Sequence, residues 1–297
     1  MNYCIACVLF LAALTAAEQG FDVFKKGAEV TAYRTLQPCF GELKEGMTVL
    51  IFNPEVISRS TRLKFADPAK APKEDQVQVV CFSRNLKFRA GVEDYSAMTS
   101  VFSATGFALG REPFYPLKIA LSVSDWSGSL YQHLVTDGKG AKRVLHSYIE
   151  TEVDKSDYLP EPGDDSYYED DLPVLIRELN GVFIKMGQKK ECRIMPCLWQ
   201  SRVAGKPLAF EQGVIEKKKG RRIMVGGGIR SSTAWSWQVA GRTVEFQVDQ
   251  NYPHCILEWK DSEGGLGQIL RPPVYTPYWQ EHLNKDMALR KQIGVDK

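Results

Sequence analysis

Histidine is scarce in this chain, which limits the acid–base chemistry that it can perform. The four histidines are His133, His146, His254 and His282. His133 and His146 fall on neighbouring arms of an expected hairpin and could share a metal, but a register shift of one residue would put them on opposite faces. Ser127 and Ser129 precede His133 without the Gly-x-Ser-x-Gly pattern of a nucleophile. We therefore interpret the histidines as structural and assign no catalytic residue.

Cysteine chemistry is similarly restricted. Of seven cysteines, Cys4 and Cys7 fall in a segment expected to be removed, which leaves Cys39, Cys81, Cys192, Cys197 and Cys255. An odd number cannot all pair within the chain. Cys192 and Cys197 could be joined, or either could pair with Cys255, but buried free thiols with at most one or two disulfides are the favoured interpretation. No C-x-x-C or H-x-x-x-H spacing follows residue 17, so neither a metal site nor a cofactor is expected.

Two runs of charge invite functional interpretations. Residues 154–171 carry eight acidic side chains but lack the ordered ligand spacing of a calcium loop, which favours an acidic surface segment. The run Lys217–Arg222 is expected to form the solvated tip of a hairpin. The adjacent Gly226-Gly227-Gly228 lacks a following Gly-Lys-Ser, so a flexible turn is favoured over a phosphate loop.

The six tryptophans suggest a binding function. Trp235 and Trp237 are two residues apart, so in a strand they share one face. A concave sheet lined by such residues could hold an apolar or sugar ligand, and Trp126, Trp235 and Trp237 are the candidate ligand-binding residues. Packing in the core is the alternative explanation for each of them.

Composition and the N-terminus indicate where the protein works. The 38 basic and 36 acidic residues give a net charge of +2, so nucleic acid is not an expected partner. Residues 1–17 are uncharged and end in small residues, which predicts a secretory signal peptide; an uncleaved anchor or a buried helix is the alternative. No later run reaches the ~18 apolar residues of a membrane helix. We expect export to the periplasm or cell envelope, or secretion, with no transmembrane segment after cleavage.

Strand patterns must position these residues. Residues 117–123, 130–135 and 143–150 alternate apolar and polar side chains around an Asp137-Gly138 turn, which predicts consecutive antiparallel strands. Similar patterns, residues 198–200 among them, recur on both sides of a helix expected at residues 172–179, with Asp170 or Asp171 as N-cap. A terminal helix could span residues 279–293. The fold predicted is mainly β: an antiparallel barrel or strongly curved half-barrel sheet with one or two capping helices, forming a single domain over residues 18–297.

Several stretches resemble a known family. GAEVTAY, FGELKEG, TVLIFNPEVIS, SAMTSVFSAT and LSVSDWSGSLYQ, within residues 23–150, are similar to exported bacterial proteins of unknown function, some of them labelled septum formation inhibitor Maf. The chain has neither the early Ser-x-Arg segment nor the alternating βα pattern of genuine Maf pyrophosphatases. It also has Trp126-Ser127 where the family tends to have Trp-Cys. The resemblance implies export and protein class, and brings no active site.

Three classes of function follow from these observations. The first is a binding or carrier module that holds an apolar or lipid-like molecule inside the curved sheet. The second is an envelope hydrolase, which would require His133 or His254 beside an acid and a nucleophile in a cleft. The third is a structural envelope protein, for which the interior of the sheet should be filled.

Overall fold

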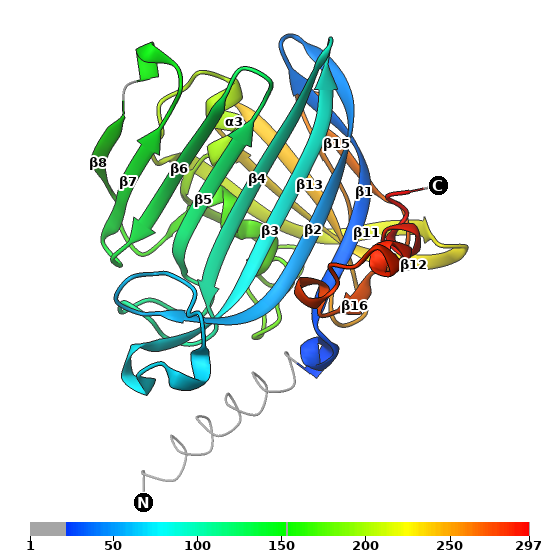
Figure 1. The fold of residues 1–297 in the computed structure, drawn as a ribbon, viewed down its shortest axis with the longest axis horizontal. Helices are drawn as coiled ribbons and strands as arrows, with labels where there is room; N and C mark the ends of the chain where they lie inside the picture. The colour runs from blue at the N-terminus through cyan, green and yellow to red at the C-terminus, as the bar shows by residue number, and fades with distance from the viewer. Residues whose placement is uncertain (1–21, 153, 297) are drawn as a thin grey trace, which may run out of the picture.

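The computed structural model describes residues 22–152 and 154–296, and strands of both halves of the chain join one 16-stranded sheet (Figure 1). The strands of the first half are β1 (Ala28–Cys39), β2 (Glu42–Ser58), β3 (Gln76–Ala90), β4 (Glu93–Ala104), β5 (Pro116–Ser124), β6 (Ser129–Thr136), β7 (Gly140–His146) and β8 (Lys155–Pro160). Each pairs antiparallel with the next along the chain. The strands predicted at residues 117–123 and 130–135 are therefore confirmed, whereas the strand predicted at residues 143–150 ends at His146.

The second half forms another meander. Its strands are β9 (Ser166–Tyr168), β10 (Lys189–Met195), β11 (Glu211–Val225), β12 (Gly228–Val239), β13 (Arg242–Asp249), β14 (Ile256–Asp261), β15 (Leu266–Ile269) and β16 (Val274–Thr276). Only β9 and β10 pair in parallel. The two meanders join through β1, whose residues 33–36 pair with β15 while residues 28–30 pair with β16.

The sheet is curved but does not close into a barrel. Its two edge strands, β8 and β9, are consecutive in the chain and are joined by residues 161–165 alone. Because a chain extends by at most about 3.6 Å per residue, the facing ends of these strands lie within roughly 22 Å of each other. The mainly β, antiparallel expectation is confirmed, and the closed-barrel alternative is not.

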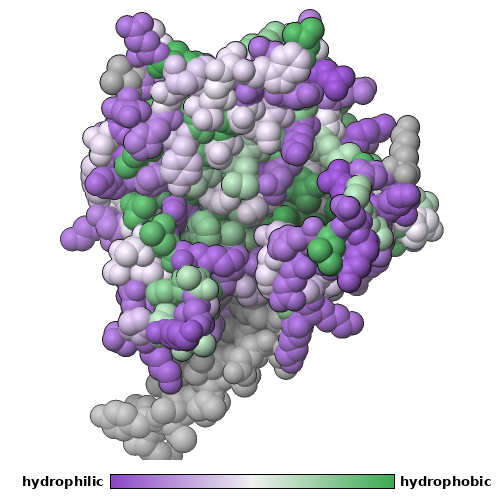
Figure 2. All heavy atoms as spheres, viewed as in Figure 1, coloured by the Kyte–Doolittle hydropathy of each residue, from purple (hydrophilic) through white to green (hydrophobic). Residues whose placement is uncertain are grey.

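Alternation along the strands separates an interior face from an exterior face. In β5, Leu117, Ile119, Leu121 and Val123 are buried, and the intervening residues are less buried. The exterior face of β1 to β8 is mostly polar or weakly polar, with apolar side chains in small groups (Figure 2). Interior side chains of both meanders form one apolar core with side chains of the segments 172–184 and 198–210, which lie outside the strands of the sheet.

The helices are shorter than expected. The middle helix, α2, spans only Leu172–Leu175 after a 3₁₀ turn at Glu169–Asp171. Asp171 does not cap it, because its carboxylate accepts a hydrogen bond from the Ser103 hydroxyl on β4. At the C-terminus, short 3₁₀ turns precede α4 (Ala288–Ile293), so the predicted helix at residues 279–293 forms only in its last part.

Three further expectations need correction. Residues 198–200, interpreted as a strand, begin α3 (Leu198–Val203). The run Lys217–Arg222 is no hairpin tip: β11 continues through it to Val225, and the chain turns at Gly226-Gly227, both at positive φ. The acidic segment is exposed over most of its length, but Glu169 and Asp171 at its end are buried.

The segment predicted as a signal peptide lies outside the described residues. Among residues 22–152 and 154–296, no helix is long and apolar enough to cross a membrane.

Candidate functional site

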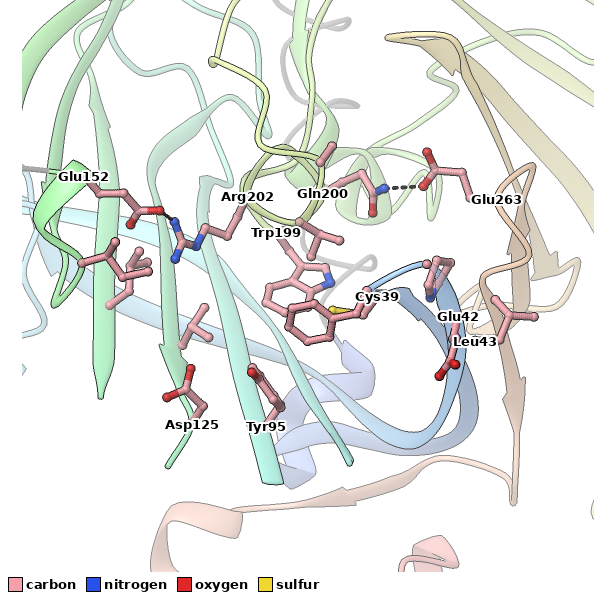
Figure 3. A pocket seen from close by; sticks show the side chains of 18 of the residues that line it. Cys39, Glu42, Leu43, Tyr95, Asp125, Glu152, Trp199, Gln200, Arg202 and Glu263 are labelled. Carbon is pink, nitrogen blue, oxygen red and sulfur yellow. Dashed lines mark hydrogen bonds and ion pairs between the residues drawn. The ribbon is translucent and has the colours of Figure 1, made fainter. Parts of the chain in front are cut away.

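A cavity of about 770 Å³, which we call the outer cavity, opens at one end of the sheet (Figure 3). It lies between α3, the β1–β2 and β14–β15 turns, and the strand ends around the β5–β6 turn. Its apolar wall consists of Phe40, Leu43, Tyr95, Val123, Leu130, Ile149, Trp199 and Val203. A volume of this size with mainly aromatic and aliphatic walls is typical of a small-molecule site.

Helix α3 carries Trp199 into this cavity, and buried acidic residues fix the start of the helix. The amide of Cys197 donates to Glu169 Oε2 and the amide of Leu198 donates to Asp170 Oδ2, each at 2.9 Å. These carboxylates satisfy amides that a helix N-terminus otherwise leaves unpaired. Trp199 is therefore held against Phe88 at a ring distance of 6.0 Å, and its buried Nε1 has no partner among the described residues.

Polar contacts hold α3 at the rim of the outer cavity. Arg202 forms an ion pair with Glu152, and the Gln200 amide donates to Glu263 in the β14–β15 turn (Figure 3). The lining also includes the carboxylates of Glu42 and Asp125. The residues that line the outer cavity thus include four carboxylates and only one arginine, so the rim is acidic.

The β1–β2 turn places an aromatic ring at the mouth of the cavity. Its two residues, Phe40 and Gly41, have φ values of 54° and 74°. Two positive φ values in a two-residue hairpin loop are typical of a type I′ turn, which favours asparagine or glycine and is unfavourable for a bulky residue. Phe40 is 68% exposed, and its ring lies 5.8 Å from that of Tyr95.

A smaller inner cavity, of about 70 Å³, lies deeper in the sheet and adjoins the outer cavity at Trp199 and Gln200. One wall is a row across three strands, in which Arg84 of β3 lies between Leu50 of β2 and Thr99 of β4. The facing wall comes from the second meander, where Val244 lies between Trp237 and Asp261. The rest of the lining consists of Gln37, Phe82, Glu169, Asp170, Pro173, Cys197, Arg242, Phe246 and Trp259.

Of the two arginines that line the inner cavity, Arg242 has an ion-pair partner and Arg84 does not. Glu169 forms an ion pair with Arg242 and accepts a hydrogen bond of 2.9 Å from Trp237 Nε1. Burial alone would lower the pKa of Arg242, but the Glu169 carboxylate raises it overall. Burial raises the pKa of Asp170 to about 7, so this side chain gains or loses its charge near neutral pH.

Arg84 lacks such a partner. One Nη atom lies 3.5 Å from Gln37 Oε1, and the guanidinium lies 5.8 Å from the centre of the Trp259 ring. Its buried Nε has no hydrogen-bond partner, and within residues 22–152 and 154–296 no carboxylate is at ion-pair distance from it. Burial lowers the pKa of Arg84, but arginine stays charged in proteins.

A second cavity, of about 700 Å³, opens at the opposite ends of β4 and β5. It is lined by the β4–β5 loop, residues 164–171 and residues 175–183. At its edge Arg111 pairs with Glu161 and Asp164, and the Tyr115 and Tyr168 hydroxyls donate to Glu161. Arg111, the cation at this end, is therefore already paired with carboxylates of the protein.

The three tryptophans predicted to bind ligand do not lie together. Trp126 is 66% exposed on the β5–β6 turn, whereas Trp235 and Trp237 are 1% and 2% exposed and point into the interior. Trp237 lines the inner cavity, and Trp235 stacks on Phe183 at 5.9 Å. Their role in binding stays a prediction.

The histidines lie away from the cavities. Register pairs His133 with Val144 and His146 with Tyr131, which puts both histidines on the exterior face of the hairpin. His254 has its Nδ1 3.0 Å from the Asp249 carbonyl oxygen, and His282 is exposed. In the part of the chain that the structure describes, no histidine lines the outer, inner or second cavity.

The cysteines Cys39, Cys81, Cys192, Cys197 and Cys255 are free and buried, as the favoured interpretation had it. Burial raises the pKa of Cys197, which disfavours the reactive thiolate. The described residues contain no group of three or more histidine, cysteine and acidic side chains that could hold a metal ion.

Comparison of the chain with protein-family models, curated proteins and solved structures finds no match. The fold and the cavities define an open, curved and mainly antiparallel sheet of 16 strands among the described residues, with a cavity of largely aromatic and aliphatic walls at one end.

Proposed function

We propose that this protein is an exported binding or carrier module that holds an apolar or lipid-like molecule in the outer cavity. The observation that carries the proposal is the cavity of about 770 Å³ with aromatic and aliphatic walls at the open end of the curved sheet. Apolar area removed from water contributes roughly 25 cal/mol per Å², so such walls favour an apolar occupant.

The same observations disfavour the two alternatives. The envelope hydrolase would require His133 or His254 beside an acid and a nucleophile in a cleft, and among the described residues no histidine lines the outer, inner or second cavity. A purely structural protein would have a filled interior, whereas two adjoining cavities lie around Trp199.

Native mass spectrometry of the chain purified without detergent from the exported fraction tests the proposal directly. We expect an additional mass that organic solvent releases. A bare chain mass, together with no binding of the apolar fluorescent probe N-phenylnaphthylamine, would remove the support for carriage and return the hydrolase and structural functions to consideration.

Filling the outer cavity is expected to weaken the binding of N-phenylnaphthylamine. Val203 is half-buried on α3 and lines the outer cavity, so the Val203→Trp substitution should lower probe affinity at least tenfold. The matched control is Val182→Trp, because Val182 lines the second cavity and is 70% exposed. Probe titration with both variants decides the location, since loss of affinity in the control alone would place the ligand in the second cavity.

The Phe40→Asn substitution in the β1–β2 turn should lower probe affinity without lowering the free energy of unfolding. Asparagine tolerates positive φ better than phenylalanine, so Phe40→Asn should leave the free energy of unfolding unchanged or raise it by up to about 1 kcal/mol. Loss of the ring at the cavity mouth should nevertheless lower probe affinity about threefold or more.

The control for this change is the β12–β13 turn. Ala240 and Gly241 have φ values of 55° and 78°, so Ala240→Asn should relax the same kind of turn without altering the outer cavity. Urea unfolding and probe titration measure both variants. If Phe40→Asn destabilised the protein while probe affinity stayed constant, Phe40 would be a packing residue and not part of the binding surface.

A further inference from the structure

The charges along the two adjoining cavities differ with depth. At the rim of the outer cavity, Asp125, Glu152 and Glu263 add negative charge, and the Arg202 guanidinium is paired with Glu152. In the inner cavity, Glu169 pairs with Arg242, and Asp261 lies 4.0 Å from the same arginine. Arg84 is thus the cation of these walls with no carboxylate at ion-pair distance among the described residues, although Asp170 and Asp261 interact with it electrostatically from farther away.

An arginine in such a position favours an anionic ligand group. Taking a charge out of water is costly unless a counter-charge and hydrogen bonds compensate it. A guanidinium presents paired N–H donors that match the two oxygens of a carboxylate. Gln37 and Thr99 lie beside Arg84 in the lining and can hydrogen-bond to the same group.

We propose that the ligand is an amphiphile with a carboxylate head, which binds Arg84 in the inner cavity while its apolar chain lies in the outer cavity. This inference rests on the proposed carrier function and specifies the ligand for the same site. Trp199 and Gln200 line both cavities, so the proposal places the apolar chain beside these two side chains, between the inner and the outer cavity.

The size of the inner cavity limits the head group. A cavity of about 70 Å³ has room for roughly five waters, at 10–15 Å³ of probe volume for each. A carboxylate fits this space, whereas a phosphate esterified to glycerol is larger. Asp170 also lines the inner cavity, and it can remain protonated beside a bound anion because burial raises its pKa to about 7.

Three probes with the same ten-carbon chain test the head group: decanoate, decanol and decylamine, titrated against the full chain by calorimetry. We expect decanoate to bind the unmodified protein at least tenfold more tightly than decylamine. The Arg84→Met substitution should lower decanoate affinity at least tenfold and change decanol affinity less than threefold, because only the carboxylate uses the guanidinium.

The matched control is Arg34→Met, since Arg34 is exposed on β1 and donates to Gln268 Oε1 at 3.1 Å. It should leave all three affinities unchanged. Arg84→Lys retains the positive charge but lacks the paired N–H donors of the guanidinium. Its decanoate affinity should therefore lie between those of the unmodified protein and Arg84→Met. The ranking of head groups on the unmodified protein applies even if Arg84→Met does not fold.

The outcomes separate this inference from the carrier function. If decanol binds but decanoate binds no better, or if decylamine binds best, the carboxylate assignment is overturned and the carrier function stands. If none of the three binds the unmodified protein, the carrier function itself is overturned.

Discussion

Replacing Glu29 by glutamine is expected to lower the free energy of unfolding by about 3–5 kcal/mol, the usual cost of removing one partner of a buried ion pair. Glu29 of β1 is 2% exposed and accepts a bond of 2.7 Å from Arg177, whose side chain is fully buried. Tyr275 and Cys255 also donate to the same carboxylate. Without its charge, the guanidinium remains in the interior with no counter-ion among the described residues.

Urea unfolding measures this effect, with Glu42→Gln as the control. Glu42 belongs to the same β1–β2 hairpin and pairs with Lys44, but its side chain is 71% exposed, so its loss should change the free energy of unfolding far less than the loss of Glu29. The double variant Glu29→Gln with Arg177→Met should recover part of the loss, because it removes the uncompensated charge. A cost below about 1 kcal/mol for Glu29→Gln would mean that the Pro253 carbonyl and the Phe52 ring suffice to hold Arg177.

This ion pair also explains how the chain covers its own sheet. Arg177 follows α2, on the segment between β9 and β10, and it connects that segment to β1 and to the Pro253 carbonyl. Asp170 and Glu169 connect the same segment to the start of α3. Buried polar contacts therefore fix the position of α3, and with it the position of Trp199 in the outer cavity.

Local patterns in the sequence were sufficient for most of the strands and for the mainly β class of fold. Alternation over residues 117–150 needs only neighbours in the chain, and it predicted the hairpins correctly. The pairing of β1 with β15 joins residues more than 200 positions apart, and no local pattern encodes such a contact. The extent of the sheet and its failure to close therefore could not be predicted.

The misplaced hairpin tip has a different cause. The run of charge at Lys217–Arg222 suggests a solvated turn, but the glycines at 226 and 227 are the residues that adopt positive φ easily. Lys217 is in fact buried, where it pairs with Glu178 and lies 4.9 Å from the centre of the Trp235 ring. A lysine in this position is compatible with a strand because aromatic and acidic neighbours compensate its charge.

The site was harder to predict than the fold. Trp199 was missed because Leu198–Gln200 has the composition of a strand, and its helix depends on caps supplied by Glu169 and Asp170 from 28 residues earlier. Arg84 was missed because a single arginine in a strand carries no motif. One signal was available for the acidic caps: they stand between Tyr168 and the apolar run from Leu172, which indicates burial better than charge alone indicates exposure.

The burial of Asp170 and Asp171 leads to the second prediction. The free energy of unfolding should fall as the pH rises from 6.5 to 8. Burial raises the pKa of Asp171 to about 8 and that of Asp170 to about 7, whereas an unfolded aspartate titrates near 3.9. Between these values the folded state holds more protons than the unfolded state, so raising the pH favours unfolding. Each protonated carboxyl contributes a slope of up to about 1.4 kcal/mol per pH unit. His133, whose pKa burial lowers, acts in the opposite direction only below about pH 6.5.

The Asp171→Asn substitution should flatten this slope. An asparagine keeps the contact with Ser103 but carries no charge to desolvate, so its advantage over the unmodified protein should grow as pH rises toward 8. Urea unfolding at intervals from pH 6.5 to pH 8 measures the slope. Asp164→Asn is the matched control, because Asp164 is in the same acidic segment with a fully exposed side chain and should leave the slope unchanged. Equal slopes for Asp171→Asn and the unmodified protein would show that Asp171 is ionised throughout this range, and that its charge is compensated in the fold.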